Sequence, residues 1–232
     1  MSDTLGPRAG ATRKDNAMTA GSLDPKRTCL LFFDTSKLFV NGPSLDPQAR
    51  RADVVTAVSN WQRQLTMARE LGMMVAYAHT AQRVDEANYY PRLLDLHEDL
   101  DPYPIGVRRP MSRAVIGTRE VSVIDEIEPQ SDDYVFWKER WDPWHQTTFE
   151  LSLRRRDVDT IIVNGGSTEI GIAATAYGAH RLDFDVVFVS DGCTTKEVEC
   201  QDILMRSILP RIGRVRTTDE VLSMLRDGDA AR

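Results

Sequence analysis

The sequence has little cysteine, no long apolar run and no cluster of basic residues. Its three cysteines, Cys29, Cys193 and Cys200, are odd in number and lack the spacing of a metal site, so we expect neither a disulfide framework nor a cysteine-rich metal centre. Free thiols fit a reducing, cytoplasmic location. No apolar stretch approaches the roughly 20 residues of a membrane span, and we recognise no signal peptide, so no membrane association is expected.

Acidic residues outnumber basic ones. The chain has 29 lysines and arginines against 35 aspartates and glutamates, a net charge of -6 and a pI near 5.3. The basic residues are scattered, which argues against nucleic-acid binding and against a polybasic membrane patch. The expected partners are a small-molecule substrate and further copies of the chain, in a homodimer or homotetramer.

The length of 232 residues suits one α/β domain. Residues 1–25 are polar and rich in glycine, alanine and serine, so we expect a disordered tail there. Residues 26–232 are expected to form a single domain.

Strand-like and helix-like patterns alternate along that domain. Residues 27–33 form an apolar run that ends at Asp34, as in a strand buried on both faces. Residues 52–71 carry apolar side chains at spacings of three and four, which predicts an amphipathic helix that ends at Gly72. Further strands are expected at 73–78, 134–137, 157–163, 185–190 and 214–216, and further helices at 119–127, 167–180, 196–209 and from Thr218. This alternation predicts a doubly wound α/β fold: a mainly parallel six-stranded sheet with helices on both faces, in three Rossmann-type layers.

Polar groups stand where several of these strands end. Asp34 ends the first strand, Gln82 follows the second, Lys138 ends the third, and a glycine-rich turn from Gly165 to Gly171 follows the fourth. Ligands of doubly wound sheets bind at the carboxyl ends of the strands. Taken alone, Asp34 is also explained as a turn cap and Lys138 as a solvated charge. Their joint position on one rim is what predicts a site.

The glycine-rich turn reads GGSTEIG. We expect Ser167 and Thr168 to cap the following helix, with Glu169 in its first turn. Such a turn directs backbone N–H groups at whatever lies above the sheet. The residues of the turn expected to bind substrate are Gly166, Ser167, Thr168, Ile170 and Gly171, with the N–H groups of Ile170 and Gly171 facing developing negative charge.

Residues 83–113 show no clean periodicity and contain several prolines. A loop of this length in a compact domain predicts a lid or a substrate-lining segment. An arm that contacts another subunit explains the pattern equally well.

These motifs resemble the isochorismatase-like hydrolase family over residues 28–225. The marks of the resemblance are FFD ending at Asp34, WKER containing Lys138, and the turn from Gly165 to Gly171. Further marks are Arg140, Asp142, Pro143, Trp144, Thr147 and the run VRTTDEVL at 215–222. The resemblance implies an isochorismatase-like fold and hydrolysis of a small molecule.

The resemblance also implies the roles of the site residues. In the family's cysteine hydrolases the nucleophilic thiol would stand at Gly171, whereas the isochorismatase branch has glycine there and hydrolyses a vinyl ether without a thioester. The residues so implied are Asp34 and Lys138 as catalytic groups, and Gln82 and Trp144 as substrate-binding ones. None of the three cysteines is a substitute, because a thiol inside a strand or helix more often behaves as a small buried hydrophobe.

Some residues depart from the isochorismatase pattern. Ser167 and Glu169 stand where that branch has an aromatic residue and a histidine, which leaves the substrate open. His79 and His145 lack the aspartate and histidine spacing of the metal-dependent relatives, so we expect no metal and no cofactor.

Three functions follow from these residues. The first is a hydrolase without a cysteine nucleophile, in which Asp34 acts as acid or base and water attacks. The second is a noncatalytic binding or assembly protein of the same fold. The third is an amidase that activates water directly.

Overall fold

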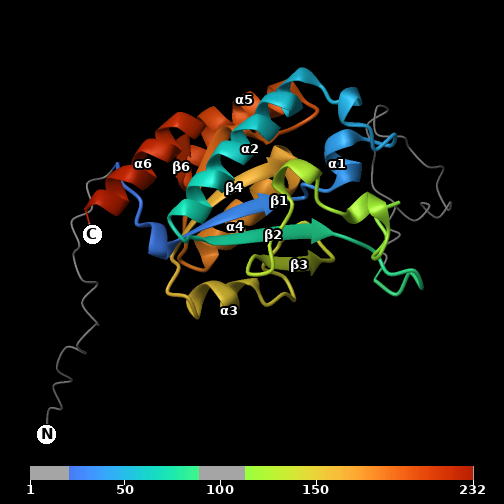
Figure 1. Cartoon of the computed structure of the whole chain (residues 1–232), viewed down its shortest axis with the longest axis horizontal. Helices are drawn as coiled ribbons and strands as arrows, with labels where there is room; N and C mark the ends of the chain where they lie inside the picture. The colour runs from blue at the N-terminus through green and yellow to red at the C-terminus, as the bar shows by residue number, and fades with distance from the viewer. Residues whose placement is uncertain (1–20, 89–112, 232) are drawn as a thin grey trace, which may run out of the picture.

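The computed structural model describes residues 21–88 and 113–231. Most of the expected N-terminal tail, and most of the 83–113 segment, lie outside this part of the chain. The centre of the fold is a six-stranded sheet (Figure 1). Its strands are β1 (Thr28–Phe33), β2 (Met74–Thr80), β3 (Tyr134–Lys138), β4 (Thr160–Gly166), β5 (Asp185–Thr194) and β6 (Arg214–Arg216).

The strand order is β3-β2-β1-β4-β5-β6, and every neighbouring pair is parallel. This confirms the predicted doubly wound α/β sheet. The strand order reverses between β1 and β4, which is where ligands of such sheets bind. The arrowheads of β1, β2 and β3 point to the same side in Figure 1, so these strands share one carboxyl rim.

Helices cover both faces of the sheet. Helices α2 (Ala52–Glu70) and α6 (Thr218–Ala230) lie along one face in Figure 1, and α3 (Phe149–Arg154) and α4 (Ala173–Arg181) lie along the other. Within residues 21–88 and 113–231, no helix combines the length and the apolar character that a membrane span requires.

Alternation along each strand divides the core between the two faces. Leu30 and Phe32 of β1 pack with Tyr77 and Trp61 on the α2 side, whereas Phe33 packs with the residues under α4. Successive side chains of a strand point to opposite faces, so a strand covered on both sides is apolar throughout. All six residues of β1 are indeed buried.

Most predicted elements are present, with shifted ends. The helix predicted at 52–71 is confirmed as α2, and Gly72 follows it with a positive φ of 58°. Strand β5 is longer than predicted, because after a register shift in β4 it pairs again, Gly165 with Cys193 and Gly166 with Thr194.

The prediction of a helix at 119–127 was wrong. The chain there forms two 3-10 turns, η4 (Arg119–Val121) and η5 (Asp125–Ile127). The reason is that its backbone pairs with the segment after Asp34: the N–H of Ile124 donates to the carbonyl of Thr35 (3.2 Å), and that of Lys37 to Ser122 (2.8 Å). Backbone groups used in this way are not available for a continuous helix.

The helix predicted at 196–209 is interrupted. It begins as α5 (Val198–Ile203), continues as a π-helical turn, η7 (Leu204–Ile208), and ends as a 3-10 turn, η8 (Leu209–Arg211), which contains Pro210. Proline has no N–H and disfavours the helical conformation of the residue before it, which explains the change near its end. The remaining short elements are η1 (Pro25–Arg27), α1 (Lys37–Asn41), η2 (Pro47–Ala49) and η6 (Thr168–Ile172).

Candidate active site

Asp34 and Lys138 meet on the carboxyl rim of the sheet. Nζ of Lys138 lies 2.8 Å from Oδ2 of Asp34. Asp34 directly follows β1, with a positive φ of 50° that aspartate tolerates better than most residues, and its N–H donates to the carbonyl of Ala78. Because β2 lies between β1 and β3, this contact reaches across one strand.

Thr80, at the end of that middle strand, completes the group. Its backbone N–H donates to Oδ1 of Asp34 (2.7 Å), and its hydroxyl donates to Oδ2 (3.1 Å). Nζ of Lys138 donates to the same hydroxyl (2.5 Å). We did not predict Thr80 as a site residue, although its position at the end of the second strand was a usable signal.

The ammonium of Lys138 is enclosed by protein. Its side chain has no exposed surface, whereas the side chain of Asp34 is 12% exposed. Nζ also lies 4.0 Å from the centre of the Phe33 ring, a cation–π contact. Burial lowers the pKa of Lys138, and the Asp34 carboxylate opposes that shift. The reading of Lys138 as a solvated charge at a strand end was therefore wrong.

The glycine-rich turn borders the same group. Strand β4 lies beside β1, and Phe33 is in register with Gly165. Gly165 has a φ of 110°, and a Cβ there would lie 2.0 Å from the carbonyl oxygen of Phe33, so glycine is required. The peptide bond between Gly166 and Ser167 is cis.

The turn continues into η6 and α4, but not with the predicted capping. Ser167 occupies the N-cap position of η6 without a side-chain capping bond, and the hydroxyl of Thr168 donates to the carbonyl of Thr194 (3.2 Å) instead. The N–H of Ile170 donates to the carbonyl of Ser167 (3.3 Å). Glu169 has a buried Oε2 with no hydrogen-bond partner among the described residues.

Of the other predicted site residues, Gln82 lies two residues after the end of β2, and Trp144 is buried. The backbone of Gln82 is fixed beside Val115 by bonds from its N–H to Ala114 (2.7 Å) and from Ile116 to its carbonyl (2.9 Å). Trp144 is 8% exposed, packs in the core with Phe149 and Phe184, and donates from Nε1 to the carbonyl of Thr175 (3.0 Å). The structure thus places Trp144 beneath α4.

Two of the three cysteines are buried in the core, and the third, Cys200, is half-buried on α5. Cys29 and Cys193 are buried, and burial raises the pKa of both thiols, that of Cys193 to about 12. Sγ of Cys193 also donates to the carbonyl of Val163 (3.3 Å). A protonated, enclosed thiol is a poor nucleophile.

His79 lies next to the charged pair, on the other face of β2. It is 1% exposed and packs between Tyr77 (6.2 Å between ring centres) and Trp137 (5.9 Å). Burial lowers its pKa to about 4, so it is neutral at pH 7. In the part of the chain that the structure describes, no three His, Cys, Asp or Glu side chains are grouped as metal ligands.

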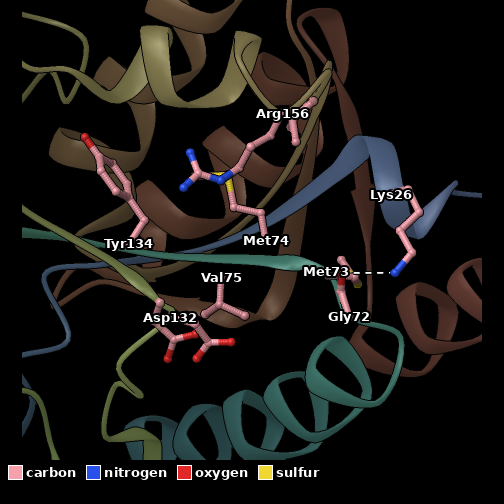
Figure 2. A pocket seen from close by; sticks show the side chains of 10 residues that line it. Lys26, Gly72, Met73, Met74, Val75, Asp132, Tyr134 and Arg156 are labelled. Carbon is pink, nitrogen blue, oxygen red and sulfur yellow. Dashed lines mark hydrogen bonds between the residues drawn. The ribbon is translucent and has the colours of Figure 1, made fainter.

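A pocket of about 310 Å³ lies at the opposite end of the strands (Figure 2). Its lining includes Met74 and Tyr134, which begin β2 and β3, and Lys26, which donates from Nζ to the carbonyls of Leu71 (2.9 Å) and Gly72 (3.3 Å). None of the predicted site residues lines it. Because ligands of this sheet class bind at the carboxyl ends of strands, we place the candidate active site at Asp34.

Known proteins are similar to this chain in sequence. The model of the Isochorismatase domain matches residues 28–220. The chain is 38% identical over 103 residues to the uncharacterized isochorismatase family protein YwoC of Bacillus subtilis (strain 168), covering 44% of this chain and 54% of that protein. It is 26% identical over 218 residues to the isochorismatase of the same organism, covering 89% of this chain and 61% of that enzyme. Both alignments thus span less than two thirds of the relative's length.

Solved structures of this family are similar to the chain over most of its length. A cysteine hydrolase from Pseudomonas syringae pv. phaseolicola 1448A is similar with a TM-score of 0.74 and 26% identity, over 90% of this chain and 96% of that one. The family match extends from the first residue of β1 into α6, so it includes Asp34, Lys138 and the glycine-rich turn. The chain belongs to the isochorismatase family.

Proposed function

We propose that this protein hydrolyses a small molecule at Asp34 without a covalent enzyme intermediate. The contact of 2.8 Å between Lys138 and Asp34 is the observation that carries the proposal. A buried lysine paired with a partly exposed carboxylate is costly to maintain for packing alone, because desolvation of the charges offsets much of their attraction. Such a pair at the ligand-binding rim is therefore a functional candidate.

Asp34 is suited to accept a proton. Among the described residues its carboxylate has three hydrogen-bond contacts, from the Lys138 ammonium, the Thr80 N–H and the Thr80 hydroxyl. All three are donations to the carboxylate, and an ionised carboxylate accepts hydrogen bonds only. In this proposal Asp34 takes a proton from the attacking water as general base and passes it to the leaving group as the substrate bond breaks. Lys138 has no exposed surface, so it acts by holding Asp34 in position.

The absence of a side chain at Gly171 supports attack by water. A thioester route needs a thiol next to the acid and base groups, and Cys29 and Cys193 are buried in the core. The N–H groups of the turn at Gly171 would face developing negative charge, although that of Ile170 already donates to Ser167. We also propose that the substrate is a small molecule, that the protein forms a homodimer or homotetramer, and that it is located in the cytoplasm.

A hydrolysis screen tests this function. Wild type and Asp34→Asn would be assayed against vinyl ethers, amides and lactones, with Asp219→Asn as a control, because Asp219 is an exposed carboxylate on α6. We expect turnover by wild type and by the control, loss in Asp34→Asn, and no effect of iodoacetamide. Tight binding of a ligand without turnover would support a noncatalytic binding protein, and inactivation by alkylation would rule out the proposed chemistry.

A further inference from the structure

The space next to Gly171 is already occupied. A Cβ placed on this glycine would lie 2.0 Å from Cε1 and 2.5 Å from Cζ of Phe33. Carbon atoms in van der Waals contact are separated by roughly 3.5–4.0 Å, so no side chain fits at position 171 while the ring stays in place. Gly171 is itself buried.

Phe33 has little freedom to move away. It is the last residue of β1, 1% exposed, and is paired in register with Ala78 of β2 on one side and Gly165 of β4 on the other. Close-packed cores resist the displacement of such a side chain. The backbone of Phe33 is held as well, because Gly165 lies close to the Phe33 carbonyl.

The same ring contacts the charged pair. Nζ of Lys138 lies 4.0 Å from the ring centre and 2.8 Å from Oδ2 of Asp34. One aromatic side chain thus lies against the helix turn at Gly171 and also against the ammonium that holds Asp34. Its position makes it part of the site although it carries no reactive group.

We infer that Phe33 determines the reaction class of this site, because its ring excludes any nucleophilic side chain from position 171. The inference rests on the proposed function, because it concerns the same site at Asp34. With Phe33 present, only a small molecule such as water attacks there. Without the ring, the site accommodates a side chain at position 171 that reaches reactants.

A double-mutant cycle on thermal stability tests the exclusion of side chains. Gly171→Ala should lower Tm by roughly 4–10 °C, since overpacking a core forces neighbours out of place. Phe33→Leu should lower Tm by a similar amount through the volume that it removes. The Tm of the double variant should fall by less than the sum of the two single decreases, by roughly 3 °C or more. The smaller side chain at position 33 makes room for the new Cβ at position 171.

Gly178→Ala provides the matched control. Gly178 lies in α4, seven residues after Gly171, and a Cβ there would meet Cδ1 of Trp144 at 2.1 Å rather than Phe33. Its effect should therefore add to that of Phe33→Leu without coupling. An unchanged Tm for Gly171→Ala, or simple additivity with Phe33→Leu, would overturn the inference.

Alkylation tests whether the ring keeps a nucleophile out. Gly171→Cys would be made in a Cys200→Ser parent, with and without Phe33→Leu, and intact mass would be followed in iodoacetamide under native conditions. Cys29 and Cys193 are buried, so the parent should stay unlabelled. We expect labelling at least tenfold faster with Phe33→Leu than without it. Equal labelling, or none in either folded variant, contradicts the role of Phe33. Neither experiment requires turnover, so they are independent of the proposed hydrolysis.

Discussion

Asp34 and Lys138 are 104 residues apart in the chain, and their charged atoms lie 2.8 Å apart. The contact depends on three neighbouring strands, because β1 supplies Asp34, β3 supplies Lys138, and Thr80 at the end of β2 bonds to both. A carboxylate with exposed surface is thus held by an ammonium that has none. The buried ammonium of Lys138 therefore has Asp34 as its counter-charge.

Replacing the carboxylate tests the proposed chemistry. Asp34→Asn should lower kcat/KM by roughly 100- to 10,000-fold, the usual contribution of a general base. The amide retains an oxygen that accepts the Thr80 N–H, so circular dichroism should be unchanged. Unchanged kcat/KM in Asp34→Asn would contradict the proposed chemistry.

Replacing the ammonium tests the positioning role of Lys138. Lys138→Met should cost about 3 kcal/mol of unfolding free energy, because it leaves Asp34 without its charged partner. The double variant with Asp34→Asn should recover a large part of that loss, since no unpaired charge is left. Urea denaturation measures both. Lys37→Met is the control: its partner Asp125 is 80% exposed, and such pairs contribute about 1 kcal/mol or less. Equal losses in Lys138→Met and Lys37→Met would count against the positioning role.

His79 should make the protein less stable in acid. Burial lowers its pKa from 6.5 to about 4 in the folded state, so between these values the unfolded chain binds more protons than the folded one. Stability should therefore fall as pH decreases from about 6.5 to about 4, by about 3 kcal/mol from this group. His79→Phe retains a ring between Tyr77 and Trp137 and should remove that part of the slope. An unchanged pH dependence of urea denaturation in the variant would contradict this account.

Trp144 should affect stability and leave substrate binding unchanged. Trp144→Phe removes the hydrogen bond from Nε1 to the Thr175 carbonyl and some buried surface, which should cost roughly 1–3 kcal/mol. Because the indole packs with Phe149 and Phe184 in the core, KM should stay within about twofold of wild type. A large rise in KM with little loss of stability would restore Trp144 to the substrate-binding set.

Several features were predictable from the sequence because they depend on local periodicity. The apolar run that ends at Asp34 fixes a buried strand, and the amphipathic pattern at 52–71 fixes a helix between two strands. Alternation of such segments leads to a parallel sheet whose strand ends share one rim. The sequence therefore predicts that Asp34, Lys138 and the turn at Gly171 lie together. The same reasoning wrongly predicted a helix at 119–127, because the backbone of that segment pairs with Thr35 and Lys37.

The sequence by itself determined the strands, their direction and the family, whereas tertiary structure decided what each rim residue contacts. Local patterns identify a strand but carry little information about which distant strand lies beside it or how deep a side chain lies. Only the packing of β1 between β2 and β4 places the Phe33 ring against Gly171 and Lys138. The burial of Lys138, the bonds of Thr80 and the core position of Trp144 are likewise set by segments far apart in the chain. Side-chain contacts of this kind depend on the whole fold, because in a close-packed interior the neighbouring side chains determine the space that each group can occupy.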